Sequence, residues 1–243
     1  MQPRKMIALL VINSNQFVSV ADLYSELWQE QLPPSAKATL QGYVVRLRKI
    51  LAGHAGCEVV TRPGGYLMRV EQGVLDLQSF EEVLMEARRL RRSGQDEPAV
   101  QAFRTALAMR RGPVLGDMEP GPVLEPSVMR ITQACDSAIE QRMGCELRLG
   151  RHLDILDELS ELVLRNPLHE GLHARFMIAL YRSGRRGMAI DAYERLRLAL
   201  ATRLGLDPAP GLRRLHLAIL QDDPLLEIPR AASADRSLEQ FVA

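Results

Sequence analysis

The sequence has few aromatic residues, few cysteines and no long apolar run. Aromatic side chains make up 5% of its 243 residues, and its three cysteines (Cys57, Cys135 and Cys145) form no C-x-x-C pair. An odd number of unpaired cysteines indicates reduced, structural thiols, as is typical of a cytoplasmic protein. No apolar stretch is long enough to cross a bilayer and no signal-peptide pattern is present, so we expect neither a membrane protein nor a secreted one.

Common enzyme motifs are also missing. The chain contains no G-x-x-x-x-G-K-[ST] loop, which excludes a built-in ATPase of that type, and no G-x-S-x-G nucleophile elbow. The composition, 47% hydrophobic and 25% charged, is that of an ordinary globular chain with enough apolar material for a core. Leu, Ala and Arg dominate, which favours helices.

Lysine is rare as well, and charge is distributed unevenly along the chain. Residues 1–70 hold eight Lys/Arg against four Asp/Glu, a balance of +4, whereas residues 71–243 hold 23 against 26, a balance of −3. All three lysines (Lys5, Lys37 and Lys49) lie in the first part. A small basic domain joined to a larger, mildly acidic one suggests a polyanion binder attached to a second module.

The basic part predicts three helices. Residues 3–15 place apolar side chains at helical spacing after a proline. Ser19 can cap a second helix over 20–28, and the Pro-Pro break that follows ends it. Ser35 can cap a third helix over 36–51.

The third helix has two contrasting faces when plotted at 100° per residue. Its buried stripe would be Leu40, Val44, Leu47 and Leu51, with Tyr43 beside it. The opposite face holds Ala38, Gly42, Val45, Arg46 and Lys49, flanked by Thr39, Gln41 and Arg48. Small residues ringed by cationic and polar side chains suit a helix that enters the major groove of DNA.

A β-hairpin is predicted after the third helix. The segment CEVVTRPGGYLMRV is rich in β-formers around Arg62-Pro63-Gly64-Gly65, which places an arginine at the turn. Three helices followed by such a hairpin describe a winged helix-turn-helix, whose wing arginine would lie over a minor groove. The alternative is a helical subdomain with a solvated basic face. The candidate DNA-binding residues are Lys37, Thr39, Gln41, Arg46, Arg48, Lys49 and Arg62.

These residues resemble a known family. The stretches ATLQGYVVRLRKIL and VVTRPGGYLM are similar to the recognition helix and wing of bacterial response regulators. The continuation, to about residue 225, resembles the Streptomyces antibiotic regulatory proteins, in which that domain precedes a bacterial transcriptional activation domain. The resemblance implies that Arg46 reads bases, Arg48 binds phosphate and Arg62 approaches the minor groove. The family usually carries a small N-terminal sheet before the first helix, whereas this sequence starts almost at that helix. We therefore expect the sheet to be missing or truncated here, or the native start to lie upstream.

The larger part, residues 71–225, predicts a repeated all-helical architecture. Gly94, Gly150 and Gly184 are each followed at +5 by Ala99, Ile155 and Ala189, and at +9 by Phe103, Leu159 and Tyr193. Gly150 and Gly184 are 34 residues apart, the tetratricopeptide period. Stacked helix pairs of this kind bury a continuous apolar seam and leave a concave face for a partner. The Pro- and Gly-rich segment 110–126 predicts an ordered loop, and residues 226–243 predict a loosely held tail.

One motif points to a different chemistry. His169-Glu170-Gly171-Leu172-His173 is a formal H-E-x-x-H, which on a helix can hold a catalytic zinc, and Glu194 has the spacing of a third ligand. However, Leu168, Leu172, Phe176 and Leu180 already claim one face of that helix as core, and the longer metzincin pattern is absent. A chance match therefore explains the motif best, and we expect no metal there.

The sequence thus favours a mainly α protein that regulates transcription. We expect a cytoplasmic, nucleoid-associated DNA-binding activator of antibiotic-biosynthesis genes, without a cofactor or enzymatic activity. Its expected partners are double-stranded promoter DNA, RNA polymerase and a second copy of the chain, placed head to tail on direct repeats. Activation and direct repeats are implied by the resemblance alone. The competing hypotheses are a protein-binding repeat adaptor and a zinc peptidase.

Overall fold

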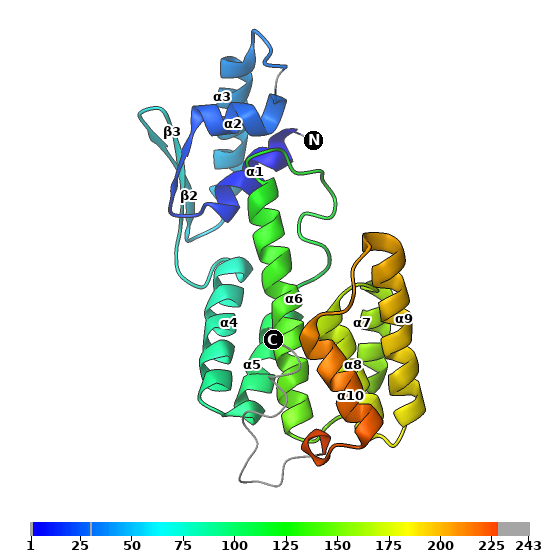
Figure 1. Ribbon diagram of the computed structural model, residues 1–243. Coiled ribbons are helices and arrows are strands. Elements are labelled where there is room, and N and C mark those ends of the chain that lie inside the picture. The colour runs from blue at the N-terminus through cyan, green and yellow to red at the C-terminus, as the bar shows by residue number, and fades with distance from the viewer. Residues whose placement is uncertain (1, 30, 228–243) are drawn as a thin grey trace. The chain divides into compact units, whose positions relative to one another are not determined.

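The computed structural model of the protein describes residues 2–29 and 31–227. These residues are mainly helical, with a small three-stranded sheet in the N-terminal part (Figure 1). Contacts divide the chain into two compact units, of which one combines Met1–Val83 with Thr105–Ser137 and the other Leu84–Arg104 with Ala138–Ala243. Three helices contribute residues to both units: α4 (Asp76–Arg92), α5 (Asp96–Ala108) and α6 (Glu125–Arg148).

The first unit begins with three helices and a β-hairpin. These elements are α1 (Gln2–Ile12), α2 (Val20–Trp28), α3 (Ala36–Leu51), β2 (Cys57–Arg62) and β3 (Gly65–Val70). A further short strand, β1 (Phe17–Ser19), pairs antiparallel with β3 and gives the strand order β1-β3-β2. The three helices and the hairpin with its turn at residues 62–65 were predicted from the sequence and are confirmed. Strand β1 was not predicted.

The apolar stripe of α3 forms part of the core of this unit. Leu40, Val44 and Leu47 are each at most 3% exposed and pack in one cluster with side chains from α1, α2, β2 and β3. Burying a side chain of this size stabilises the fold by about 1.5–3 kcal/mol, so the stripe holds α3 in place. Leu51, predicted as the fourth member of the stripe, is only partly buried at the end of the helix.

Three local predictions for this unit are refined by the structure. Ser19 caps α2 as expected, because its hydroxyl accepts from the Asp22 N–H at 3.0 Å and Asp22 returns a bond to Ser19. Ser35 stands at the cap position of α3 but makes no side-chain capping bond. The first helix ends at Ile12 rather than at residue 15, because Asn15 takes a left-handed conformation and exchanges two hydrogen bonds with the Val70 backbone, both 2.9 Å.

Close approach of two strands explains the glycine that opens β3. A Cβ atom at Gly65 would lie 2.2 Å from the Val18 carbonyl oxygen and 2.7 Å from the Phe17 ring. Only glycine lets β1 pair with β3 at that point. The second half of the Arg-Pro-Gly-Gly turn therefore also makes room for the third strand.

The Pro- and Gly-rich segment is an ordered loop, as predicted, and a buried carboxylate holds it. Glu26 of α2 is 0% exposed. Its oxygens accept hydrogen bonds from the backbone N–H groups of Gly121 at 2.6 Å, Val123 at 3.0 Å and Leu124 at 2.9 Å. Three donors compensate the desolvation of this carboxylate and satisfy the backbone just before α6 begins. Leu124, itself 0% exposed, joins the same apolar cluster as α3.

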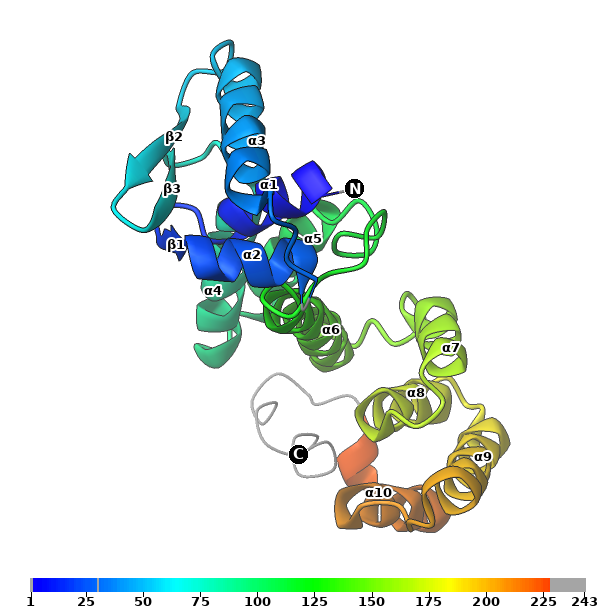
Figure 2. The ribbon, with the colours of Figure 1, turned by 90° about the horizontal axis from the view of Figure 1, so that it is seen from above.

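The second unit consists of packed helices. Beside its parts of α4, α5 and α6 it contains α7 (Leu156–Arg165), α8 (Glu170–Arg182), α9 (Arg186–Leu204), α10 (Pro210–Gln221) and a 3-10 helix at Pro224–Leu226. Helices that follow one another from α7 to α10 are in contact, and Figures 1 and 2 show α8, α9 and α10 side by side. Their inward side chains form one apolar cluster.

The three repeats found in the sequence share one turn geometry. Gly94, Gly150 and Gly184 have φ of +72°, +76° and +72°, the left-handed region that favours glycine. In each case the N–H of the following residue bonds to the carbonyl five residues earlier, which is the Schellman arrangement. The residues predicted at +5 and +9 are all buried: Ala99, Ile155 and Ala189, and Phe103, Leu159 and Tyr193.

The C-terminal tail predicted over 226–243 lies outside the described residues except for its first two positions. There, Leu226 is 0% exposed and its carbonyl accepts a hydrogen bond from Arg182 at 2.8 Å. Among the described helices, none combines the length and the apolar character that a membrane span requires.

Removing the Glu26 carboxylate should destabilise the first unit. Glu26→Ala leaves two buried N–H groups and one part-buried N–H group without an acceptor, which we expect to lower the free energy of unfolding by about 2–4 kcal/mol. Urea denaturation followed by circular dichroism measures the loss. Glu125→Ala removes an exposed carboxylate from the first turn of α6 and serves as the control. Equal stabilities of the two variants would show that the Glu26 bonds contribute nothing.

Candidate nucleic-acid interface

The outward face of α3 carries small residues in the first half of the helix, which leaves the surface flat there. Ala38 and Gly42 are exposed, and a Cβ added at Gly42 would meet no atom within 4 Å. A mid-helix glycine costs stability relative to alanine and here gains no contact within the protein. The small residues therefore leave the helix backbone open to close approach from outside.

Cationic side chains surround this flat surface. Lys37, Arg46 and Lys49 are exposed on α3, as is the predicted polar residue Gln41, whereas Thr39 is half-buried. Within residues 2–29 and 31–227, neither these three cations nor Arg62 has an ion-pair partner. Unpaired cations on one helix face retain their full attraction for an external anion.

Arg48 differs from the other predicted site residues, because it is bonded inside the protein. Its Nε donates to the Val59 carbonyl at 3.0 Å and its Nη2 donates to the Thr61 hydroxyl at 2.7 Å. Both partners lie on β2, which runs beside α3 in Figure 2, so the two bonds of Arg48 fasten α3 to the hairpin. Its structural role is thus to position the two elements. Any contact with phosphate would use the guanidinium N–H groups that these two bonds do not occupy.

Arg62 lies at the turn of the hairpin. It is the last residue of β2, is exposed, and pairs with Gly65 of β3 in the strand register. Thr61, its neighbour, is held by Arg48 of α3. The Arg48–Thr61 hydrogen bond therefore connects α3 to the strand that carries the predicted wing arginine, Arg62. The other predicted site residues, from Lys37 to Lys49, lie on α3 itself.

The sequence did not identify the groups that hold this arrangement together. Arg48 as a tether, Asn15 on the β3 backbone and Glu26 under the loop each act on partners at least 11 residues away. Asn15 stands among other polar residues and Glu26 lies in an amphipathic helix, so nothing local distinguishes them or indicates their partners.

The HEGLH segment does not form the helical pair of imidazoles that a zinc peptidase needs. His169 lies before α8 as its N-cap, with an extended backbone, and only His173 is inside the helix. The His169 Nδ1 accepts from the Leu172 N–H at 3.4 Å and its Nε2 lies 3.0 Å from Glu140. Both ring nitrogens are thus occupied by protein groups, which leaves none for a metal.

The other members of this motif are engaged as well. Glu170 accepts from the Ala209 N–H at 2.6 Å, and Glu194 pairs with Arg197 at 2.8 Å. His173 is buried, which lowers its pKa, whereas the hydrogen bond to Glu140 raises the pKa of His169. Across the described part of the chain, no group of three His, Cys, Asp or Glu side chains is arranged to hold a metal ion.

Comparison with known proteins places this architecture in a family. Residues 75–220 match the model of the bacterial transcriptional activator domain. The chain is 39% identical to Regulatory protein DnrI of Streptomyces peucetius, over 96% of this chain and 90% of that protein. It is 35% identical to Regulatory protein AfsR of Streptomyces coelicolor, covering 96% of this chain and only 23% of AfsR.

A solved structure is also similar over nearly the whole chain. It is Mycobacterium tuberculosis EmbR in complex with a low affinity phosphopeptide, with a TM-score of 0.87 and 31% identity. The match covers 99% of this chain and 62% of the EmbR chain, so EmbR, like AfsR, carries further sequence. With the family model, the relatives and the fold in agreement, this chain belongs to the Streptomyces antibiotic regulatory protein family of transcriptional regulators, which carry a bacterial transcriptional activator domain.

Proposed function

We propose that this regulator binds double-stranded promoter DNA through α3 and the β2–β3 hairpin. Residues 1–70 would act as a winged helix-turn-helix, with α3 in the major groove and Arg62 over the adjacent minor groove. Arg46 would read base edges, because a guanidinium can donate two hydrogen bonds to guanine. Lys37 and Lys49 would hold phosphates, with Thr39, Gln41 and Arg48 beside them.

One observation carries this proposal: the exposed face of α3 combines small residues with cations that have no partner in the described protein. Gly42 costs helix stability and a side chain there would begin in open space, and Ala38 on the same face is exposed. A merely solvated helix face would have no need of a glycine inside the helix. A duplex explains both features, because the backbone must approach closely while cations meet phosphates.

The remaining helices, residues 71–225, would form a tetratricopeptide-like activation domain. The repeated left-handed glycine turns and the buried residues at +5 and +9 support this architecture. Such a domain would present a surface to RNA polymerase at the promoter of an antibiotic or secondary-metabolite gene cluster. The membership of the family supports activation, and the location is expected to be the cytoplasm, at the nucleoid.

Two copies of the chain would bind together on DNA. Direct repeats in a promoter require head-to-tail placement of the protomers, because a two-fold dimer would instead match a palindrome. Footprinting of the DNA upstream of the neighbouring operon would locate the repeats. Repeating it with RNA polymerase would show whether the regulator increases the occupancy of the promoter by the polymerase.

Arg46 and Lys49 should differ in what they contribute to binding. On a footprinted duplex, Arg46→Ala should cost about 1–3 kcal/mol and relax the base preference at one position. Lys49→Ala should weaken all sequences alike and reduce the salt slope by about 1. Fluorescence anisotropy at several salt concentrations, on matched and mismatched duplexes, measures both effects.

The matched control is Arg203→Ala, which removes one positive charge from an exposed position near the end of α9. It should leave affinity and salt slope as in the unaltered protein. If all three variants bind the duplex equally well, recognition by Arg46 and Lys49 of α3 is excluded. If the chain binds no duplex at low salt, the protein-binding adaptor hypothesis replaces the proposal.

Gly42→Leu should separate folding from binding. A Cβ atom at this exposed position meets no atom within 4 Å, so the free energy of unfolding should rise by up to about 1 kcal/mol. DNA affinity should nevertheless fall by about tenfold or more, a change of about 1.4 kcal/mol, because the side chain holds the helix away from the groove. Gly187→Leu, at another open and exposed position in α9, should raise stability alone. Unchanged affinity of Gly42→Leu would remove the central support of the proposal.

The competing peptidase hypothesis is tested by metal content. Protein purified without chelators should hold much less than one zinc per chain by mass spectrometry. His173→Gln should leave that value unaltered, because His169 and Glu170 are bonded within the protein. Stoichiometric zinc that is lost in His173→Gln would instead favour an enzyme.

A further inference from the structure

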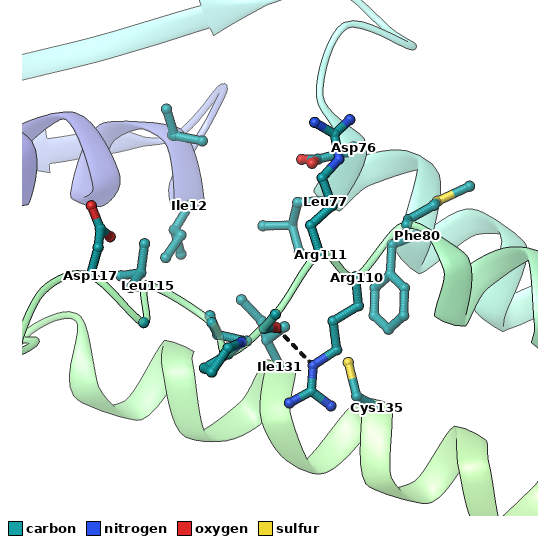
Figure 3. Close-up of a pocket in the computed structure, with 16 residues that line it drawn as sticks. Ile12, Asp76, Leu77, Phe80, Arg110, Arg111, Leu115, Asp117, Ile131 and Cys135 are labelled. Carbon is teal, nitrogen blue, oxygen red and sulfur yellow. Dashed lines mark hydrogen bonds between the residues drawn. The ribbon is translucent and has the colours of Figure 1, made fainter.

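A cavity of about 520 Å³ lies within the first unit, away from α3. Its walls come from the end of α1, the start of α4, the middle of α6 and the loop over residues 109–117 (Figure 3). Most of its lining is apolar, and the side chains that matter here are Ile12, Leu77, Phe80, Leu115, Ile131 and Cys135.

The volume and lining of the cavity fit a small organic molecule. Sites for such ligands measure roughly 300–1,000 Å³, are lined mainly by apolar side chains, and contain a few polar groups that fix orientation. The floor is firm, because Phe80, Ile131 and Cys135 are each at most 7% exposed. A cavity of this size would hold many waters, yet the apolar walls offer them few hydrogen bonds.

The polar groups of the cavity leave one positive charge uncompensated. Arg110 and Arg111 line it, and neither has an ion-pair partner in the described part of the protein. The Arg110 Nε donates to the Gly112 carbonyl at 3.0 Å, and Figure 3 shows its guanidinium extending toward Cys135, away from Arg111. Of the two acids in the lining, Asp117 is paired with Arg4 at 2.8 Å, which leaves Asp76 alone.

From these observations we propose that the cavity binds a small, mainly apolar molecule that carries a single anionic group. The apolar body would lie against Phe80, Leu77 and Ile131, and the anion would pair with the guanidinium of Arg110 or Arg111. One negative charge balances the excess left by the two arginines and Asp76. Arginine suits this task, because its planar donors match carboxylate and sulfonate geometry.

Occupancy of this cavity would stabilise the unit that carries α3. Ile12 and Leu115 line the cavity and also pack against the apolar cluster that holds Leu40, Val44 and Leu47. A ligand that binds only the folded unit raises its stability in proportion to the logarithm of ligand concentration. The inference concerns ligand binding itself and holds whether or not α3 contacts DNA.

Two probes that share their rings and differ by one sulfonate group test the proposal on the full chain. 8-Anilinonaphthalene-1-sulfonate carries one sulfonate, and N-phenyl-1-naphthylamine has the same rings without it. Fluorescence titration should give saturable binding of the anionic probe to one site per chain, tighter than that of the neutral probe. A rise of the melting temperature with the concentration of the anionic probe is the second measurement.

Variants locate the site. Arg110→Ala or Arg111→Ala should lower the affinity for the anionic probe by about tenfold and the affinity for the neutral probe by less than about twofold. Val114→Phe, which fills the cavity, should weaken both probes. Arg203→Ala, which removes an equal charge from the other unit, should affect neither.

The proposal is overturned if both arginine variants bind the anionic probe as tightly as the unaltered protein. It is also overturned if these variants lose affinity for the anionic and the neutral probe to the same extent. Unchanged binding by a folded Val114→Phe would place the probe elsewhere and have the same consequence. Should Val114→Phe not fold, the arginine variants decide alone, because both side chains belong to exposed residues. DNA binding is measured separately on the same variants, so loss of the probe site and loss of α3 function are distinguishable.

Discussion

The buried carboxylate of Glu26 is the contact on which the N-terminal architecture depends. It joins α2 to backbone N–H groups that lie 95 or more residues further along the chain. A carboxylate removed from water must find donors, and here they are the otherwise unpaired N–H groups before α6. Through this bond Leu124 reaches the core beneath α3, so the compact unit extends into residues 105–137, well beyond the basic segment.

Periodic features of this fold are readable from the sequence. The apolar spacing of Leu40, Val44 and Leu47 predicts both α3 and its outward face, and the Arg-Pro-Gly-Gly turn predicts the hairpin. The glycine register of the repeats predicts which residues are buried nearly 100 positions apart along the chain. These signals are local or repeated, and each is carried by residue types whose conformational preferences are strong.

Features that depend on a distant partner are not readable in the same way. β1 has only three residues, and its pairing requires a neighbour that lacks a side chain, Gly65. Arg48 is one arginine among several on α3, and nothing local distinguishes the one that bonds β2. The HEGLH motif shows the reverse case, because a spacing that suggests a metal site is used for a helix cap and for core packing.

The two bonds between Arg48 and the hairpin would also limit which DNA the proposed interface can fit. In the proposed complex, the reach from one groove to the next would be set by the protein and not by the duplex, because Arg48 fastens α3 to β2. A domain of this kind would tolerate a substituted base pair better than an inserted one. An inserted base pair rotates the second groove by roughly a tenth of a turn relative to the first.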